Sequence, residues 1–240
     1  ADNAPAGKID VILAEVARYG VANVRRAYGN WKSPHLKGWE AVLHEYAIRP
    51  IQQFAYSSGK NASDMAMVID AMDLLYARNL DGFAIVSSDA DFTPLVMRLL
   101  TDGEKVYGFG EKKTPLPFVN ACSKFTYIEA LGAPEDNGKA ALAAPKVAQD
   151  LRGDTRLVQM LRSAVEAGSG DDGWTHLGVV GSQISNQASF DPQNYGYRKL
   201  SDLVKASGLF EVKQEGKTIW VRDKPRKRTP AKKASGKPTG

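Results

Sequence analysis

Segments with a helical period of apolar residues alternate with short apolar runs along the first 130 residues. The clearest helical pattern follows Ser63, a good N-cap residue, and its apolar residues recur about every 3.6 positions as far as Tyr76. The run Phe83–Val86 is typical of a buried strand. Further helices are predicted over Lys8–Arg18, His35–Tyr46, Pro94–Leu100 and Phe118–Ala121, and further strands over Asn23–Gly29, Ile51–Tyr56, Val106–Phe109 and Phe125–Ile128. The alternation predicts an α/β fold, with a parallel sheet covered by helices on both faces.

The pattern changes in residues 150–222. Leu157, Leu161 and Val165 form a helical stripe that ends at Gly168. Two more helices are predicted, followed by a β-hairpin; the helices span Trp174–Gln187 and Tyr197–Ser207, and the strands Leu209–Val212 and Thr218–Val221. This order is typical of a small winged-helix domain, a fold that does not by itself define a ligand. Residues 131–149, rich in Gly, Pro and Ala, are predicted to be a linker.

Composition and charge narrow the classes of function. The net charge of the 240-residue chain is +5, but residues 223–240 carry seven basic side chains against Asp223 alone. This tail lacks large apolar residues, so we expect it to be disordered. It is either a solubilising extension or an arm that binds phosphates through residues such as Arg226, Lys227 and Arg228. The single cysteine excludes an intramolecular disulfide, and the absence of a long apolar run or signal peptide favours a cytoplasmic protein away from membranes.

Two acids, Asp89 and Asp91, directly follow the predicted strand Phe83–Val86. Ligands of open parallel sheets bind at the carboxyl ends of the strands, so these side chains lie where a functional site is expected. An alternative is that Asp91 only caps the following helix. That alternative explains Asp89 less well.

Asp64 opens the long helix that precedes this strand. On a helical projection Asp64 borders the apolar stripe, whereas Asp70 points away from it and is expected to be solvated. Asp64 could therefore meet Asp89 at the edge of the sheet. The alternative is that Asp64 only complements the helix dipole.

A carboxylate cluster without Cys or His partners suits Mg²⁺ or Mn²⁺, and such ions commonly serve phosphoryl chemistry. The three histidines have no metal-ligand spacing, Cys122 is expected in the core, and Ser87 and Ser88 lack a neighbouring base. These observations favour a metal site over nucleophilic catalysis by serine or cysteine.

The run Ser87–Phe92, followed by Pro94-Leu95, Gly103–Val106 and the turn Gly108–Gly110, resembles the NYN domain of the PIN-like ribonuclease superfamily, in its bacterial LabA-like branch. The resemblance covers about residues 1–130. It implies that Asp64, Asp89 and Asp91 bind the metal and act in catalysis, with Asp2, Asn3 and Ser88 in support. The first-strand Asp of the family would fall two positions ahead of Asp2, and we interpret residue 1 as a boundary that cuts off the first strand.

Residues 150–222 are similar to the OST-HTH, or LOTUS, domain, a winged helix associated with RNA binding. The resemblance rests on the helix Leu157–Val165, on Trp174–Gly178 and on Tyr195–Leu203. It makes Tyr195, Tyr197, Arg198 and Lys199 candidate RNA-binding residues, although one tyrosine could instead pack in the core. Lys60, near the proposed site, is a further candidate for a phosphate contact, with simple solvation as its alternative.

Together the two resemblances imply a metal-dependent ribonuclease, expected to be an endonuclease, that acts on single-stranded or structured RNA and could be a homodimer. Two alternatives stay open. One is a non-catalytic RNA-binding or regulatory adaptor on a PIN-like scaffold, and the other is DNA binding through the winged helix.

Overall fold

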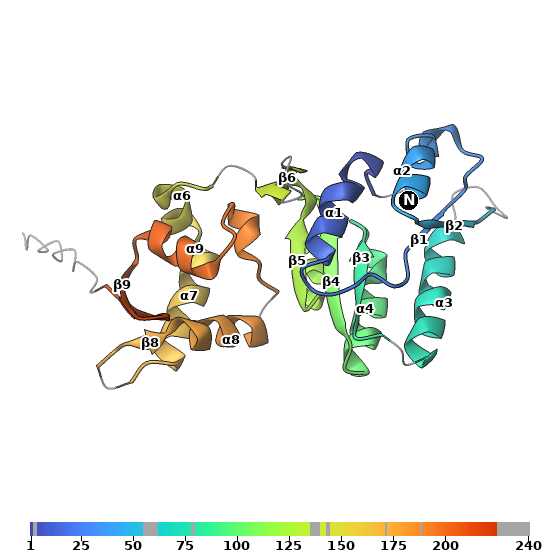
Figure 1. Ribbon diagram of the computed structural model, residues 1–240. Helices are drawn as coiled ribbons and strands as arrows, with labels where there is room; N and C mark the ends of the chain where they lie inside the picture. The colour runs from blue at the N-terminus through green and yellow to red at the C-terminus, as the bar shows by residue number, and fades with distance from the viewer. Residues whose placement is uncertain are drawn as a thin grey trace, which may run out of the picture.

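Strands and helices alternate along the N-terminal part of the computed structural model (Figure 1). The structure describes residues 1, 4–54, 62–77, 80–134, 140–142, 145–170, 172–187 and 189–224. The predicted mixed α/β fold with parallel sheets and flanking helices is confirmed.

One parallel sheet joins β3 (Gly82–Val86), β4 (Lys105–Gly110) and β5 (Lys124–Tyr127), in that order. The helices α4 (Thr93–Thr101) and α5 (Leu116–Ala121) make the crossovers between these strands. Their side chains fill a core with α3 (Ala62–Ala77) and with one face of the sheet. The largest buried members of this core are Leu99, Phe118 and Phe125.

The other face of β4 belongs to a second core. Val106 lies in the first core, whereas Phe109, an odd number of residues further on, lies in the second. Since successive side chains of a strand point to opposite faces, the sheet is covered on both sides. The second core contains residues of α1 (Ile9–Val16), of the 3₁₀ turns η1 (Ala6–Lys8) and η2 (Pro34–Leu36), and of α2 (Trp39–Glu45).

The strands β1 (Arg26–Gly29) and β2 (Arg49–Gln52) pair in parallel with each other, in a sheet separate from β3–β5. The helix α3 contacts β1 through Asp70, whose carboxylate accepts hydrogen bonds from Arg26 and from the Tyr28 hydroxyl. The expectation that Asp70 is solvated is therefore wrong. The helix lies between two layers, so the side opposite its apolar stripe meets polar groups of β1 instead of water.

The segment predicted to be a linker holds regular structure. Residues Leu131–Pro134 form β6, which follows the 3₁₀ turn η4 (Ile128–Ala130) and pairs antiparallel with β7 (Ala140–Leu142). The helix α6 (Ala148–Gly153) comes next. Leu131 is buried in the second core, which anchors the start of the segment. The strands β6 and β7 form through backbone pairing, with Leu131 as the buried anchor. The composition of the segment does not reveal such pairing, so it predicted a linker.

The C-terminal domain contains the predicted helices and hairpin. Its elements are α7 (Thr155–Ala167), β8 (Thr175–His176), α8 (Leu177–Gln187), the 3₁₀ turn η5 (Pro192–Tyr195), α9 (Leu200–Ser207), β9 (Phe210–Glu215) and β10 (Thr218–Asp223). The helix predicted from Trp174 begins only at Leu177, because Thr175 and His176 extend and pair with β10. The sheet order is β8-β10-β9, all antiparallel.

A network of hydrogen bonds joins the two domains, and we call it the domain junction. On one side, Glu15 of α1 is only 2% exposed and accepts from Gln193 Nε2 of η5 at 2.7 Å. The same carboxylate accepts from the Tyr19 hydroxyl and from Arg18 Nη1, each at 2.7 Å. Burial, the hydrogen bond to Glu15 and the nearby charges raise the pKa of Tyr19 above its usual range.

On the other side of the junction, Asp191 is 1% exposed. Its Oδ2 accepts from the Thr126 hydroxyl of β5 at 2.5 Å and lies 3.2 Å from Lys124 Nζ. Lys124 also donates to the Tyr19 hydroxyl at 2.6 Å, which links the two carboxylates into one network. A buried charge is tolerated when it is paired and hydrogen-bonded, as both acids are here.

Asn194 completes the junction by pairing with the backbone of β5. Its Nδ2 donates to the Phe125 carbonyl and its Oδ1 accepts from the Tyr127 amide, both at 2.9 Å. The strand β5 is an edge of the three-stranded sheet, so these bonds cover groups that an edge strand leaves open. The side-chain amide of Asn194 therefore makes the hydrogen bonds to β5 that a neighbouring strand would make.

Candidate active site

Asp89 and Asp91 lie in the turn that joins β3 to α4. Asp89 is the N-cap of the 3₁₀ turn η3 (Ala90–Phe92), and its Oδ1 accepts from the Asp91 amide at 2.9 Å. Asp89 thus caps this short turn, whereas the N-cap of α4 is Phe92 and makes no side-chain capping bond, so the alternative that Asp91 caps the following helix is wrong. Asp89 is half-buried and Asp91 is exposed. Both carboxylates lie beyond the carboxyl end of a parallel strand, as expected from the sequence.

Two serines hold the backbone of this turn. Ser87 is buried, and its Oγ accepts from the Asp89 amide at 3.1 Å. Ser88 Oγ accepts from the Glu111 amide at 2.8 Å and so ties the end of β3 to the end of β4. Ser88 therefore supports the turn that carries Asp89 and Asp91.

Glu111 is an acid at this edge that the sequence reasoning missed. It directly follows β4, its carboxylate lies 2.5 Å from Lys113 Nζ, and its carbonyl accepts from the Thr114 hydroxyl at 2.5 Å. The signal was an acid immediately after a strand, because Gly108–Gly110, which the sequence suggested to be a turn, is the end of β4. Glu129, which follows β5, holds the Lys112 amide with both carboxylate oxygens, at 2.9 and 3.1 Å.

Asp64 lies in the first turn of α3 and is half-buried. Over the ranges that the structure describes, no three His, Cys, Asp or Glu side chains are grouped so that they could hold a metal ion. The structure thus brings Asp89 and Asp91 together, but it does not place Asp64 in a three-carboxylate group with them. Asp2, Asn3, Lys60, Arg226, Lys227 and Arg228 lie outside the described residues.

Comparison with protein families matches residues 1–129 to the NYN domain. The chain belongs to the NYN domain family. Residues 152–221 match the OST-HTH/LOTUS domain, which fits the winged-helix order of α7 to β10. The predicted pairing of an NYN domain with a C-terminal LOTUS domain is confirmed.

Other comparisons add little. A search of curated proteins found no match. A crystal structure of a protein of unknown function from Vibrio parahaemolyticus is 18% identical, with a TM-score of 0.41, and the match covers 55% of this chain and 80% of the other. A TM-score this low carries no argument about fold or function. Within the described residues, none of the helices has the length and apolarity needed to cross a bilayer.

In the LOTUS domain the two candidate tyrosines pack against the core. The Tyr195 ring lies 6.0 Å from the Phe190 ring, with Lys146 Nζ 4.8 Å above it, and burial raises the pKa of Tyr195 to about 12. Tyr197 donates from its hydroxyl to the Lys146 carbonyl at 2.7 Å. The structural role that we weighed for one tyrosine therefore extends to both. Arg198 and Lys199 are exposed just before α9.

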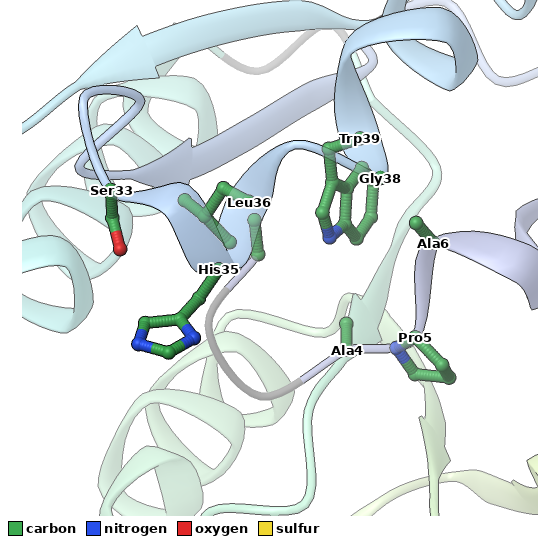
Figure 2. Close-up of a pocket in the computed structure, with 9 residues that line it drawn as sticks. Ala4, Pro5, Ala6, Ser33, His35, Leu36, Gly38 and Trp39 are labelled. Carbon is green, nitrogen blue, oxygen red and sulfur yellow. The ribbon is translucent and has the colours of Figure 1, made fainter.

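Two hollows lie on the NYN domain. One, of about 460 Å³, is bordered by the N-terminal segment and the start of α2 (Figure 2). Figure 2 shows Ala4, Pro5 and Ala6 facing Trp39 and Leu36 across this hollow. The other, of about 500 Å³, is lined by Trp31, His44 and Gln52 among others. Neither is lined by Asp64, Asp89 or Asp91.

Proposed function

We propose that this NYN protein is a metal-dependent endoribonuclease in which Asp64, Asp89 and Asp91 form the catalytic site. The observation that carries the proposal is the turn after β3. It places two acids, one residue apart, at the carboxyl end of a parallel strand, in a domain that belongs to the NYN family. NYN domains are typically nucleases, which supports hydrolysis of RNA phosphodiesters as the reaction.

The donor chemistry at this edge fits a hard divalent ion. Asp89 Oδ1 is engaged by the Asp91 amide, so Asp89 would offer its second oxygen and Asp91 its carboxylate, with Asp64 as the proposed third donor. All-oxygen donors suit Mg²⁺ or Mn²⁺. Such an ion, when bound, supplies an activated water and stabilises the leaving oxygen. The protein contributes the fixed turn, which Ser87 and Ser88 hold.

RNA is the proposed ligand of the C-terminal domain, because LOTUS domains are associated with RNA binding. Arg198 and Lys199 are exposed and would contact phosphates, and the basic residues after Asp223 would add sequence-independent attraction. We further propose that the protein acts in the cytoplasm and that it could function as a homodimer.

The test is cleavage of a labelled single-stranded RNA by the purified chain. We expect cleavage with Mg²⁺ or Mn²⁺, none with EDTA, and a loss of at least about 100-fold in the Asp89→Asn variant. Asp81→Asn is the matched control, because Asp81 is an exposed acid at the opposite end of the same strand. Cleavage that survives Asp89→Asn would overturn the nuclease proposal.

The adaptor alternative has a distinct signature. A chain that binds RNA tightly but cleaves none under any divalent ion would be a non-catalytic RNA-binding protein. Preference for duplex DNA in direct competition with RNA would instead favour DNA as the ligand.

A further inference from the structure

The outward face of the sheet β8-β10-β9 carries aromatic and cationic side chains together. The side chains of Phe210, Val212 and Val221 point into the core. Their neighbours alternate to the other face. We call this outer group the wing face; it consists of Trp174, His176, Lys213, Trp220 and Arg222. Figure 1 shows β8 and β9 on the left of the LOTUS domain, with the NYN domain on the right.

The members of the wing face contact one another closely. Lys213 Nζ lies 4.7 Å from the centroid of the Trp174 ring and 5.8 Å from that of Trp220. The guanidinium carbon of Arg222 lies 4.7 Å from the Trp174 centroid. The His176 and Trp220 rings meet edge to face, 5.7 Å apart. Each cation is therefore held beside an indole ring, within the range of a cation–π interaction.

The turn before Trp174 places this ring against β10. Gly173 has a φ of +72°, a conformation that favours glycine, and the Trp174 amide donates to Asp172 Oδ1 at 3.1 Å. A Cβ on Gly173 would lie 3.4 Å from Arg222 Cδ, so the turn passes close to that side chain. Both indole rings stay partly exposed instead of packing in the core. The local backbone thus presents an aromatic surface.

The positive charge that favours an anionic partner lies in the sequence that follows the wing face, because the cations of the face itself are paired with acids. Arg222 pairs with Glu211 (Nε–Oε2 3.0 Å) and Lys213 with Glu215 at 3.2 Å. These pairs are well exposed, and exposed pairs are weak enough to exchange for phosphate. The strand β10 leads directly into Lys224 and the rest of the basic tail. The acids offset the face itself, so the tail supplies the excess positive charge.

From this arrangement we propose that the wing face binds single-stranded RNA. Trp220 stacks on a base, while Lys213 and Arg222, which Trp174 holds in place, contact the adjoining phosphates. An aromatic ring beside cations matches a base beside phosphates along a single strand. The inference rests on RNA being the ligand of the proposed function. It assigns the contact to residues other than Tyr195, Tyr197, Arg198 and Lys199.

The test measures binding of the full chain to a labelled single-stranded RNA of about 12 nucleotides, in EDTA so that no cleavage intervenes. Trp220→Leu keeps an apolar side chain but removes the π-face, and we expect it to weaken binding about tenfold. Trp220→Tyr should keep most of the affinity, because it retains a ring for stacking.

A second experiment tests the proposed phosphate contact of Lys213. Lys213→Gln should lower the dependence of log K on log salt by about 0.7, as expected for one lost phosphate contact to a single strand. Lys217→Gln is the matched control, because Lys217 is an exposed lysine at the tip of the same hairpin. It should leave the salt dependence close to that of the parent. Unchanged melting temperatures would show that the variants are folded.

The outcomes separate the two proposals. If the parent chain binds no RNA, RNA is not the ligand and the proposed function fails with it. If the parent binds but Trp220→Leu and Lys213→Gln bind equally well, the wing face is not the RNA surface. In that case a protein partner becomes the better candidate for this face.

Discussion

Gln193 donates a 2.7 Å hydrogen bond to the carboxylate of Glu15 across 178 positions of the chain. Glu15 belongs to the first helix of the NYN domain and Gln193 to a 3₁₀ turn of the LOTUS domain, yet both side chains are buried. Each domain therefore supplies part of the other's interior. The linker does not hold the two domains together alone.

Replacing Glu15 by Ala should destabilise the whole chain. The change leaves the Tyr19 hydroxyl and the Gln193 amide without their acceptor, and a buried polar group left unsatisfied costs about 1 to 3 kcal/mol. Urea unfolding followed by fluorescence measures this loss. Glu40→Ala is the control, since Glu40 is an exposed acid of α2 and its loss should cost little. Equal stability of the two variants would contradict the junction.

Replacing Asn194 by Ala should open the edge of β5 locally. The Tyr127 amide loses its hydrogen bond to Asn194 Oδ1, so its exchange with solvent deuterium should become about 5-fold faster or more. Hydrogen exchange followed by NMR gives this rate. The Phe109 amide, in the central strand of the same sheet, should be unaffected. A Tyr127 rate that does not change would show that the bond does not protect the edge.

The contribution of Asp70 to stability should depend on pH. Burial acts to raise the pKa of Asp70, but hydrogen bonds from Arg26 and Tyr28 outweigh it and lower that pKa below its usual value. The stabilisation is thus fully present above the unfolded pKa of about 3.9 and is lost as the pH falls through the lower folded value. Asp70→Asn should lower the melting temperature at pH 7. The gap to the parent should narrow below about pH 4, and a gap that is constant down to pH 2 would refute the assignment.

Gly108 in β4 should not tolerate a side chain. A Cβ there would lie 2.6 Å from Cys122 Sγ and 2.5 Å from a carbon of the Phe125 ring. Gly108→Ala should therefore destabilise the chain by about 1 to 3 kcal/mol through overpacking. Gly20→Ala, where no atom lies within 4 Å, is the control in the same thermal denaturation series. A melting temperature equal to that of the control would mean that the core can relax around the methyl group.

The period of the apolar residues predicted the helices and strands well, because an element that buries one face carries apolar residues at that period. The helix α3 and the strand β3 lie close to their predicted ranges. The environment of Asp70 was predicted wrongly, because a projection shows which side is polar but not what covers it. The strands β6 and β7 were missed because their pairing uses backbone groups, which composition does not reveal.

Within the candidate site, the sequence located the turn with Asp89 and Asp91, since acids after a parallel strand are a local signal. It did not predict the 3₁₀ turn η3 between strand and helix, which Asp89 caps and which leaves Phe92 as the N-cap of α4. Nor did it reveal the domain junction, because no local sequence pattern links Glu15 to Gln193, which lies 178 positions away. The catalytic and RNA-binding roles stay predictions.

The junction also has a consequence for the order of events during synthesis. At about 5 to 20 residues per second, Gln193 is added roughly 9 to 36 s after Glu15, given the 178 positions between them. Throughout that interval Glu15 lacks its partner Gln193, and the β5 edge lacks the hydrogen bonds that Asn194 provides. The NYN domain can therefore reach its final packing only after η5 has been synthesised. A nascent chain that stops before η5 would present an unfinished surface to chaperones and proteases.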